Sequence, residues 1–266
     1  MIKILVPVDF SETCKKALEF ALAIGKNAKA EVHMLHVTTV PTRSGTKLIH
    51  KMRELAKEED RTMVDAETKK FISDIEVPKY LNTETIIRYG DVSKQAINVS
   101  LQEDFDLIIM GTKGVSRIKE AFMGSNTFST LKLSIIPTIV VPLAYDAEKT
   151  TDKACVALRF DKLYSNSCSK LINKSLLLGY EPELLTVVDN KSDDIEMSIK
   201  MKRKSYPVHI AKNPRPRKAI SEYIKENKSG LLALHFNTYS FFKELTYPSV
   251  SSEFTFRSEI PILFMR

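Results

Sequence analysis

The sequence predicts an α/β fold made of two tandem domains, each a five-stranded parallel sheet flanked by helices. In the first half, short apolar runs alternate with segments of helical spacing, as in a parallel sheet with right-handed crossovers. The second half repeats the same order of segments. A length of 266 residues suits two domains of average size. We place these domains at residues 1–145 and 151–266.

The first half contains five expected strands separated by helices. The opening run, residues 2–8, is continuously apolar, as expected of a strand buried on both faces. Ser11 is placed to cap the following helix, residues 12–24, and Gly25 to end it. The later strands are expected at residues 31–37, 83–88, 106–110 and 138–141, and the later helices at 47–74, 93–101 and 127–133.

The second half matches the first at two constant offsets. The matched segments at an offset of 150 are 3–6 with 153–156 and 35–37 with 185–187, and those at an offset of 124 are 106–109 with 230–233 and 136–139 with 260–263. The second copy is therefore shorter where the first has its long helix. Any two α/β domains share some of these patterns, but Pro137 and Pro261 each stand just before the last strand. We therefore infer a tandem repeat, a fused pseudo-dimer.

Composition and charge limit the classes of protein. Hydrophobic residues make up 43% and charged residues 27%, which excludes a disordered, collagen-like or coiled-coil chain. The net charge of +7 comes without a nucleic-acid motif or interleaved aromatic residues, so we do not expect nucleic-acid binding. No run approaches the ~18–20 apolar residues that span a bilayer. The chain opens on a strand, and its three cysteines are widely spaced, so we expect a cytoplasmic protein.

Glycines are concentrated after the fourth expected strand. Three of the eight glycines, Gly111, Gly114 and Gly124, lie here, beyond the carboxyl end of a parallel strand, where open α/β sheets bind ligands. Glycine lets the backbone approach a phosphate closely, and the helix start after Gly124 favours an anion. Ser125 and Thr127 add hydroxyl groups. The alternative interpretation is that these are turn glycines.

Other signatures of nucleotide binding or catalysis are absent from the sequence. It has neither G-x-x-x-x-G-K-[ST] nor G-x-G-x-x-G after the first strand. Asp9 ends that strand, where its carboxylate could bind a ribose or base or simply favour the start of the next helix. His33 and His36 are expected to be satisfied core histidines. Cys14 lies near a helix start, which can lower a thiol pKa, but scattered thiols are usually packing residues.

These segments together resemble the universal stress protein family. The resemblance rests on Val6-Pro7-Val8-Asp9-Phe10-Ser11, the strand that ends at Val37, the string G-x2-G-x9-G-S over residues 111–125, and residues 137–142. The glycine string is the mark of the ATP-binding branch of that family. The resemblance covers residues 1–142 well and 151–266 weakly. It implies Rossmann-like domains of the adenine-nucleotide alpha-hydrolase-like kind, paired through their fifth strands.

The resemblance also implies a nucleotide site in the first domain. Asp9 would contact the adenosine, Pro7 would line its pocket and Val37 would pack near the adenine. Gly111 and Gly114 would leave room for the ribose and phosphates. The other implied site residues are Met110 and Lys113 beside these glycines, and Gly124, Ser125, Asn126 and Thr127 around the phosphates. Lys113 stands where the family often has arginine, and Asn126 where a small apolar residue is common. A Mg²⁺ ion would be carried by the phosphates.

The second domain departs from this pattern. Arg159 takes the place of Asp9, and His235 the place of Gly111. The remaining counterparts are Thr238 for Gly114, Pro248 for Gly124 and Ser249 for Ser125. Side chains would then fill the space that a nucleotide needs, so we expect no ATP in this domain. The alternative is a different anionic ligand held by Arg159 and His235.

The sequence therefore predicts a tandem universal stress protein that binds ATP, or else ADP or AMP, in its first domain. We expect a nucleotide-dependent regulatory module of the stress response, with no catalytic residue and at most slow ATP hydrolysis. The alternatives are a slow ATPase or phosphotransfer protein, and a ligand-free interaction protein. The expected partners are the adenine nucleotide, the other domain of the same chain, a second copy of the chain in a further homodimer, and proteins that the sequence does not identify.

Overall fold

The structure is a computed structural model that describes residues 1–266 apart from 39–46, 113–123, 147–150, 189–196, 202–203 and 236–257. The strands of the first half are β1 (Ile2–Val8), β2 (Ala30–Thr38), β3 (Leu81–Tyr89), β4 (Leu107–Gly111) and β5 (Thr138–Val141), and its helices are α1 (Glu12–Ala28), α2 (Lys47–Phe71), α3 (Val92–Gln102) and α4 (Ser125–Leu133). Every element expected in this half is present. Their observed bounds lie within a few residues of those expected.

The prediction that α1 ends at Gly25 is wrong, because the helix continues to Ala28. Gly25, expected to end the helix, is buried inside it, and Lys29 forms the C-cap in the left-handed conformation at φ 51°. A Cβ at position 25 would lie 2.7 Å from Cε2 of the Tyr80 ring. Glycine is therefore required here because the segment before β3 packs directly on the helix.

The second half repeats the first with one added strand. Its strands are β6 (Lys153–Leu158), β7 (Glu181–Val188), β8 (Met197–Met201), β9 (Lys204–Lys212), β10 (Leu231–His235) and β11 (Ile262–Met265), and its α-helices are α5 (Asn166–Leu177) and α6 (Pro216–Glu226). The expectation of five parallel strands is incomplete, because β8 is a further strand that runs antiparallel to β9. Along the chain, β8 comes between β7 and β9, at the place where the first half has α2 between β2 and β3. The offset between the two copies changes for this reason. In the sheet, β8 is the outermost strand, beside β9.

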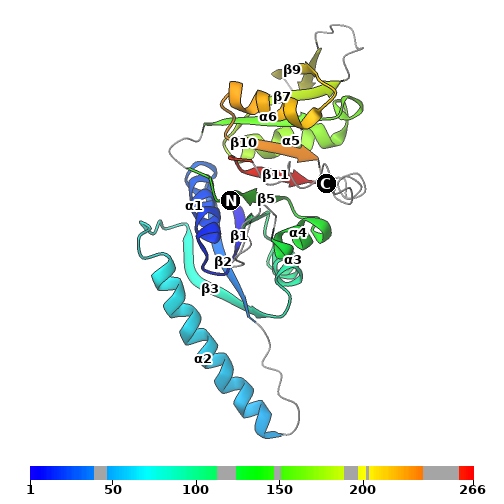
Figure 1. The fold of residues 1–266 in the computed structure, drawn as a ribbon. Coiled ribbons are helices and arrows are strands. Elements are labelled where there is room, and N and C mark those ends of the chain that lie inside the picture. The colour runs from blue at the N-terminus through cyan, green and yellow to red at the C-terminus, as the bar shows by residue number, and fades with distance from the viewer. Residues whose placement is uncertain (39–46, 113–123, 147–150, 189–196, 202–203, 236–257) are drawn as a thin grey trace.

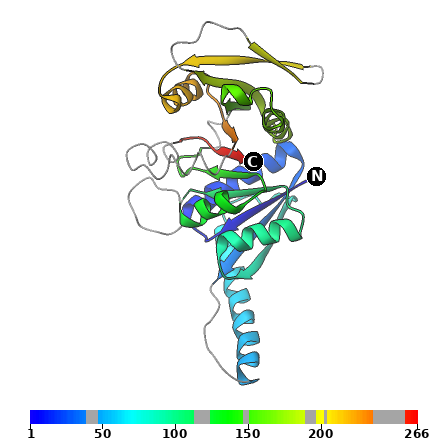
Figure 2. The ribbon, with the colours of Figure 1, turned by 90° about the vertical axis from the view of Figure 1, so that its right-hand side faces the viewer.

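All described strands join one sheet in the order β3-β2-β1-β4-β5-β11-β10-β6-β7-β9-β8. The first five and the matching strands β9, β7, β6, β10 and β11 follow the same order, so the halves are related as a pseudo-two-fold pair. They meet where β5 pairs antiparallel with β11, with Ile139 opposite Leu263. Figures 1 and 2 show the two halves stacked along the sheet at this seam. The expected pairing of the fifth strands is thus observed.

One hydrophobic core continues from the first half into the second. The fully buried ring of Phe20 on α1 packs edge-to-face on Tyr145, which lies beyond β5, with ring centroids 5.2 Å apart. Leu263 of β11 belongs to the same core cluster, together with Val6 of β1 and Val156 of β6. Because apolar contacts cross the seam, the two halves are expected to unfold together.

The same turn precedes the last strand of each half. Ser134 Oγ donates to the carbonyl of Ile136 at 3.0 Å, and the Ile136 N–H donates back to Ser134 Oγ at 3.0 Å. Ser258 and Ile260, which lie 124 residues later, form the same two bonds at 2.7 and 3.3 Å. The proline that follows in each half accepts a hydrogen bond from the neighbouring strand. This shared geometry supports the tandem-repeat interpretation.

Ser134→Ala and Ser258→Ala are each expected to lower the free energy of unfolding by about 1 kcal/mol, because each removes a hydroxyl that donates and accepts within its turn. The two effects should add in the double variant, since the two turns share no hydrogen-bond partner. Urea unfolding of the single and double variants measures this. A loss in only one of the single variants would contradict the equivalence of the turns.

Candidate functional site

The strand order reverses direction at β1. This strand pairs with β2 on one side and with β4 on the other. At such a point the carboxyl ends of the strands leave a crevice in which open α/β sheets bind ligands. Asp9 follows the end of β1, and Gly111 is the last residue of β4. The topology therefore brings together the two main segments of the predicted site.

Backbone hydrogen bonds hold the start of α4 beside β4. The Gly124 N–H donates to the Thr112 carbonyl at 2.5 Å, and the Thr112 N–H donates to the Val141 carbonyl at 3.0 Å. Two predicted site residues, Lys113 and Gly114, lie outside the described residues. Thr112 was not among the predicted residues, because its role depends on strand pairing. It places Gly124 at the carboxyl ends of β4 and β5.

The N-terminus of α4 has no side-chain cap. Its N-cap residue is Gly124, whereas the side chains of Ser11 and Asp91 accept hydrogen bonds at the starts of α1 and α3. The starts of α5 and α6 in the second half also have no side-chain cap. Ser125 and Asn126 are exposed in the first turn of α4. The first N–H groups of a helix have no partner within the helix and, with the helix dipole, favour an anion. This end of α4 therefore has the chemistry of a phosphate site.

The side chain of Thr127 does not have the role that the resemblance implies. It is only 4% exposed, and its Oγ1 donates to the Gly111 carbonyl at 2.8 Å. The hydroxyl hydrogen is used in that bond, which connects the first turn of α4 to the end of β4. Any phosphate contact at this position would come from the backbone N–H.

Gly111 is required by packing between α1 and β4. A Cβ at this position would lie 2.6 Å from the Thr13 carbonyl oxygen and 2.8 Å from its carbonyl carbon. The space into which a Cβ would point is therefore occupied by the backbone of α1, so packing alone already requires a glycine here. The close contact also brings the start of α1, with the Asp9 segment before it, next to β4.

Three predicted site residues share one face of the sheet. Val37 is half-buried and packs on the cluster that contains Leu5 and Phe105, on the side covered by α3. Because side chains alternate along a strand, Pro7 lies on the same face as Leu5. Met110 lies opposite the face of Ile109, which belongs to the core beneath α1. Pro7, Val37 and Met110 therefore form an apolar surface of the sheet at the carboxyl ends of β1, β2 and β4, in which Pro7 and Met110 are buried and Val37 is half-buried.

Among the described residues, Ser11 and Cys14 each donate a hydrogen bond to Asp9 at the end of β1. Its Oδ1 accepts from the Ser11 N–H at 3.1 Å and from the Cys14 thiol at 3.0 Å. Burial and the Asp9 charge raise the pKa of Cys14 to about 12. The helix start therefore does not lower this pKa, and Cys14 is buried, as the interpretation as a packing residue predicts. Asp9 itself is half-buried.

A pair of stacked rings borders Asp9. Phe10 adopts a positive φ of 60°, and its ring stacks on His36 with centroids 5.0 Å apart and planes 19° apart. His36 Nδ1 lies 3.0 Å from the Val8 carbonyl. A carbonyl only accepts, so Nδ1 carries the hydrogen. His36 is thus a satisfied histidine, as expected, and the sequence showed no sign of the left-handed conformation at Phe10.

The second half differs at the end of its first strand. Arg159 follows β6 and is exposed, and its Nε donates to Asp161 Oδ1 at 3.1 Å. The carboxyl end of this strand therefore carries an ion pair in place of the Asp9 carboxylate. Three counterparts of the glycine string, Thr238, Pro248 and Ser249, lie outside the described residues.

His235 ends β10 in the place of Gly111. In the second half a 3-10 helix, Phe160–Lys162, follows β6, and α5 starts only at Asn166. Burial and the nearby Lys162 and Lys170 lower the pKa of His235. The end of β10 therefore carries an imidazole where the first half has the close contact between α1 and β4.

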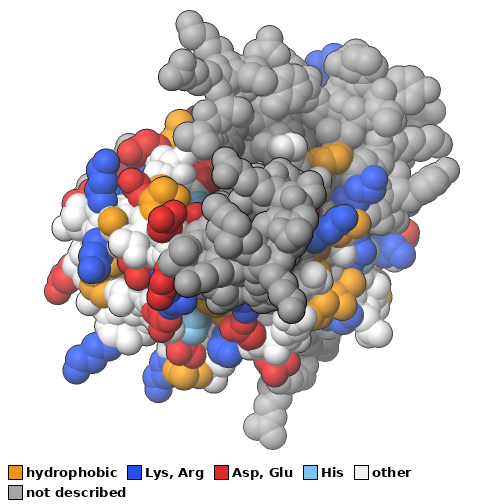
Figure 3. All heavy atoms as spheres, turned by 90° about the horizontal axis from the view of Figure 1, so that it is seen from below, with side chains coloured by type: hydrophobic (Ala, Val, Ile, Leu, Met, Phe, Trp, Pro, Cys, Tyr) orange, Lys and Arg blue, Asp and Glu red, His pale blue; other side chains and the backbone are white. Residues whose placement is uncertain are grey.

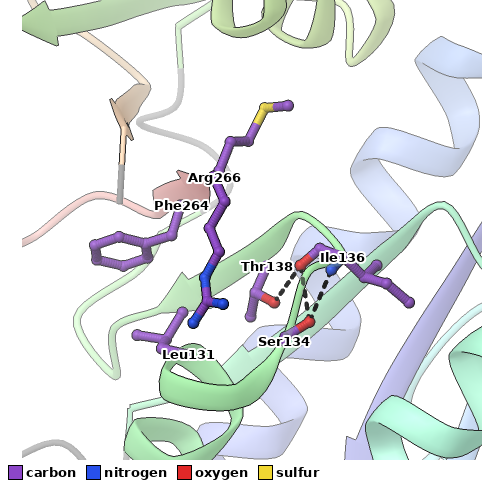
Figure 4. A pocket seen from close by; sticks show the side chains of 7 residues that line it. Leu131, Ser134, Ile136, Thr138, Phe264 and Arg266 are labelled. Atoms are coloured by element: carbon purple, nitrogen blue, oxygen red, sulfur yellow. Dashed lines mark hydrogen bonds between the residues drawn. The ribbon is translucent and has the colours of Figure 1, made fainter. Parts of the chain in front are cut away.

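A small pocket at the seam is a separate feature. It lies between the C-terminal end of α4 and β11, and Ser134, Thr138 and Phe264 are among its lining residues (Figure 4). It holds about 10 Å³ of solvent space, room for about one water molecule, far below the ~300 Å³ of small ligand pockets. The pocket is therefore too small for a nucleotide.

The part of the chain that the structure describes contains neither a cluster of metal ligands nor a membrane-spanning helix. No group of three His, Cys, Asp or Glu side chains there could hold a metal ion. Within the same residues, no helix is both long and apolar enough to cross a bilayer. On the face seen in Figure 3, basic and acidic side chains are interspersed.

Comparison with known proteins agrees with this geometry. The universal stress protein family matches residues 1–142. Universal stress protein YxiE of Bacillus subtilis is 30% identical over 145 residues, which cover 52% of this chain and 97% of the relative. Universal stress protein MJ0577 of Methanocaldococcus jannaschii is 30% identical over 151 residues, which cover 52% of this chain and 93% of the relative.

A solved structure extends the similarity to the second half. A universal stress protein from Archaeoglobus fulgidus aligns with 99% of this chain and 98% of its own, with a TM-score of 0.63 and 18% identity. At that identity the likeness concerns the fold. Because the family match spans more than half of the chain and the fold match spans nearly all of it, the chain belongs to the universal stress protein family.

Proposed function

We propose that this protein is a regulatory module that binds ATP, or else ADP or AMP, at the carboxyl ends of β1 and β4, in its first half only. The observation that supports this most is the start of α4. It has no side-chain cap, and the bond between Gly124 and Thr112 holds it at the crevice that also contains Asp9. The glycine string and the family membership agree with this proposal.

The nucleoside would bind near β1 and β2. The apolar surface of Pro7, Val37 and Met110 suits a base, which has large apolar faces and few polar atoms. The Asp9 carboxylate is a hydrogen-bond acceptor, and ribose hydroxyls are donors. Asp9 would therefore orient the sugar while the apolar surface holds the base.

The phosphates would bind at the start of α4. The backbone N–H groups of residues 124–127 and the exposed side chains of Ser125 and Asn126 are the donors there. Lys113 and Gly114 are assigned to the same end from the resemblance alone. The described residues contain no cluster of three metal ligands, so a Mg²⁺ ion would be held by phosphate oxygens and water.

The proposed role is regulation through binding. A ligand that binds one arrangement of the site stabilises that arrangement and thereby changes the surface shown to partners. We assign no catalytic residue to the crevice. Phosphate release should accordingly be slow over hours, and rapid turnover would instead favour the alternative of an ATPase or phosphotransfer protein.

Asp9→Ala is expected to abolish most of the thermal stabilisation by ATP, because it removes the acceptor for the nucleoside. At an ATP concentration 100 times Kd, the wild type should gain about 2.7 kcal/mol. Arg159→Ala changes the matching position of the second half and should keep the full gain. Dye-monitored thermal unfolding with ATP, ADP and AMP measures this. An undiminished gain in Asp9→Ala, or its loss in Arg159→Ala, would contradict the proposed site.

A further inference from the structure

One buried thiol touches the proposed nucleoside site. Cys14 lies in the first turn of α1 and is 8% exposed. Its Sγ lies 3.0 Å from Asp9 Oδ1 and 3.6 Å from the Pro7 carbonyl oxygen. A thiol has one hydrogen, and the carboxylate is both the nearer and the stronger acceptor. The hydrogen bond therefore goes to Asp9.

The thiol acts as a donor at neutral pH. Burial, and after it the charge of Asp9, raise the pKa of Cys14 to about 12. The sulfur thus remains protonated far above neutral pH, and S–H donates to the carboxylate. Asp9 Oδ1 also accepts from the Ser11 N–H at 3.1 Å. Two donors on one oxygen restrict the rotation of the carboxylate about its Cβ–Cγ bond.

We propose that Cys14 is a positioning residue for the nucleoside: its S–H bond holds the Asp9 carboxylate in the orientation that receives the ligand. This proposal rests on the proposed function, since Asp9 orients a ligand only if the nucleotide binds at this crevice. Cys14 need not touch the nucleotide. Its effect passes through Asp9, so the loss of the thiol should weaken binding without closing the site.

The second half provides a matched control. Cys168 has the same place in α5 as Cys14 has in α1, three residues after the N-cap serine, which is Ser165 in α5 and Ser11 in α1. It is 1% exposed, and burial alone raises its pKa to about 11. The two thiols thus share helix position and burial, and they differ in the neighbouring carboxylate.

The test compares the ATP affinities of the wild type, Cys14→Ala, Cys14→Ser and Cys168→Ala by titration calorimetry of the full chain. Cys14→Ala should raise Kd about tenfold, as expected for losing a hydrogen bond to a charged group. Cys14→Ser keeps a donor and should bind within a few-fold of the wild type. Cys168→Ala should leave the affinity unchanged, although it removes a buried sulfur as Cys14→Ala does.

A double variant shows whether the effect passes through Asp9. Asp9→Ala should weaken ATP binding more than Cys14→Ala does, and adding Cys14→Ala to it should change Kd no further. Unchanged affinity in Cys14→Ala, failure of Cys14→Ser to restore binding, or a further tenfold loss in the double variant would each overturn the proposal. If the wild type itself does not bind ATP, the proposed function fails instead.

Discussion

Phe264→Ala is expected to lower the free energy of unfolding of the whole chain by about 3–5 kcal/mol, the usual cost of removing a buried phenylalanine ring. Phe264 lies on β11, is 4% exposed, and pairs with Thr138 of β5 across the seam. Its ring belongs to a cluster that joins Leu131 and Val140 of the first half to Ile262 of the second. The variant would leave a cavity where the two halves meet.

Urea unfolding followed by circular dichroism measures this effect. The wild type should unfold in one transition, because the larger core cluster also crosses the seam, and Phe264→Ala should unfold at a lower urea concentration. Phe160→Ala is the control, since Phe160 is 46% exposed and its loss should change stability by only about 0.5 kcal/mol. A change below about 1 kcal/mol in Phe264→Ala would show that the seam contributes little to stability.

Gly111→Ala is expected to destabilise the protein by about 1–3 kcal/mol and to weaken ATP binding, because the added methyl group overpacks the contact between α1 and β4. The methyl carbon would lie 2.6 Å from the Thr13 carbonyl oxygen. That atom belongs to the helix backbone, so α1 as a whole must move away from β4. Asp9 and Ser11, which lead into α1, would move with it, and the crevice would lose its geometry.

Thermal unfolding and ATP titration of Gly111→Ala are to be compared with the same measurements on Gly90→Ala. Gly90 has a positive φ of 118°, and the nearest atom to an added Cβ there is Gln95 Nε2 at 3.7 Å. Alanine at position 90 is strained by its backbone conformation. Gly90 follows β3, which is separated from β1 by β2, and a methyl group there would not press on the backbone of a helix. Gly90→Ala should lose stability and keep its affinity for ATP. Normal ATP affinity in Gly111→Ala would contradict the expectation that ATP binding depends on the packing of α1 against β4.

The strands and the seam could be predicted because their signals are local. Residues 2–8 and 138–141 are short apolar runs, and Pro137 and Pro261 mark the same turn twice. The role of Gly25 could not be predicted in this way. A glycine that ends a helix and one that admits a neighbour look alike in a sequence, and the neighbour here, Tyr80, is distant along the chain.

The site could be predicted only in part, for a related reason. The positions of Asp9, Gly111 and Gly124 follow from strand ends and from the glycine string. The roles of Thr127 and Cys14 depend on tertiary distances, 2.8 Å to the Gly111 carbonyl and 3.0 Å to Asp9. For Cys14 the burial and the adjacent charge outweigh the helix start, so the direction of the pKa shift could not be read from position alone.

The central claim is that one half of this tandem protein holds a nucleotide and the other does not. Titration calorimetry of the full chain with ATP tests it most directly, because the stoichiometry is measured together with the affinity. We predict one ATP per chain, with the binding weakened by Asp9→Ala and unchanged by Arg159→Ala. Two ATP molecules per chain, or none at millimolar ATP, would contradict the claim.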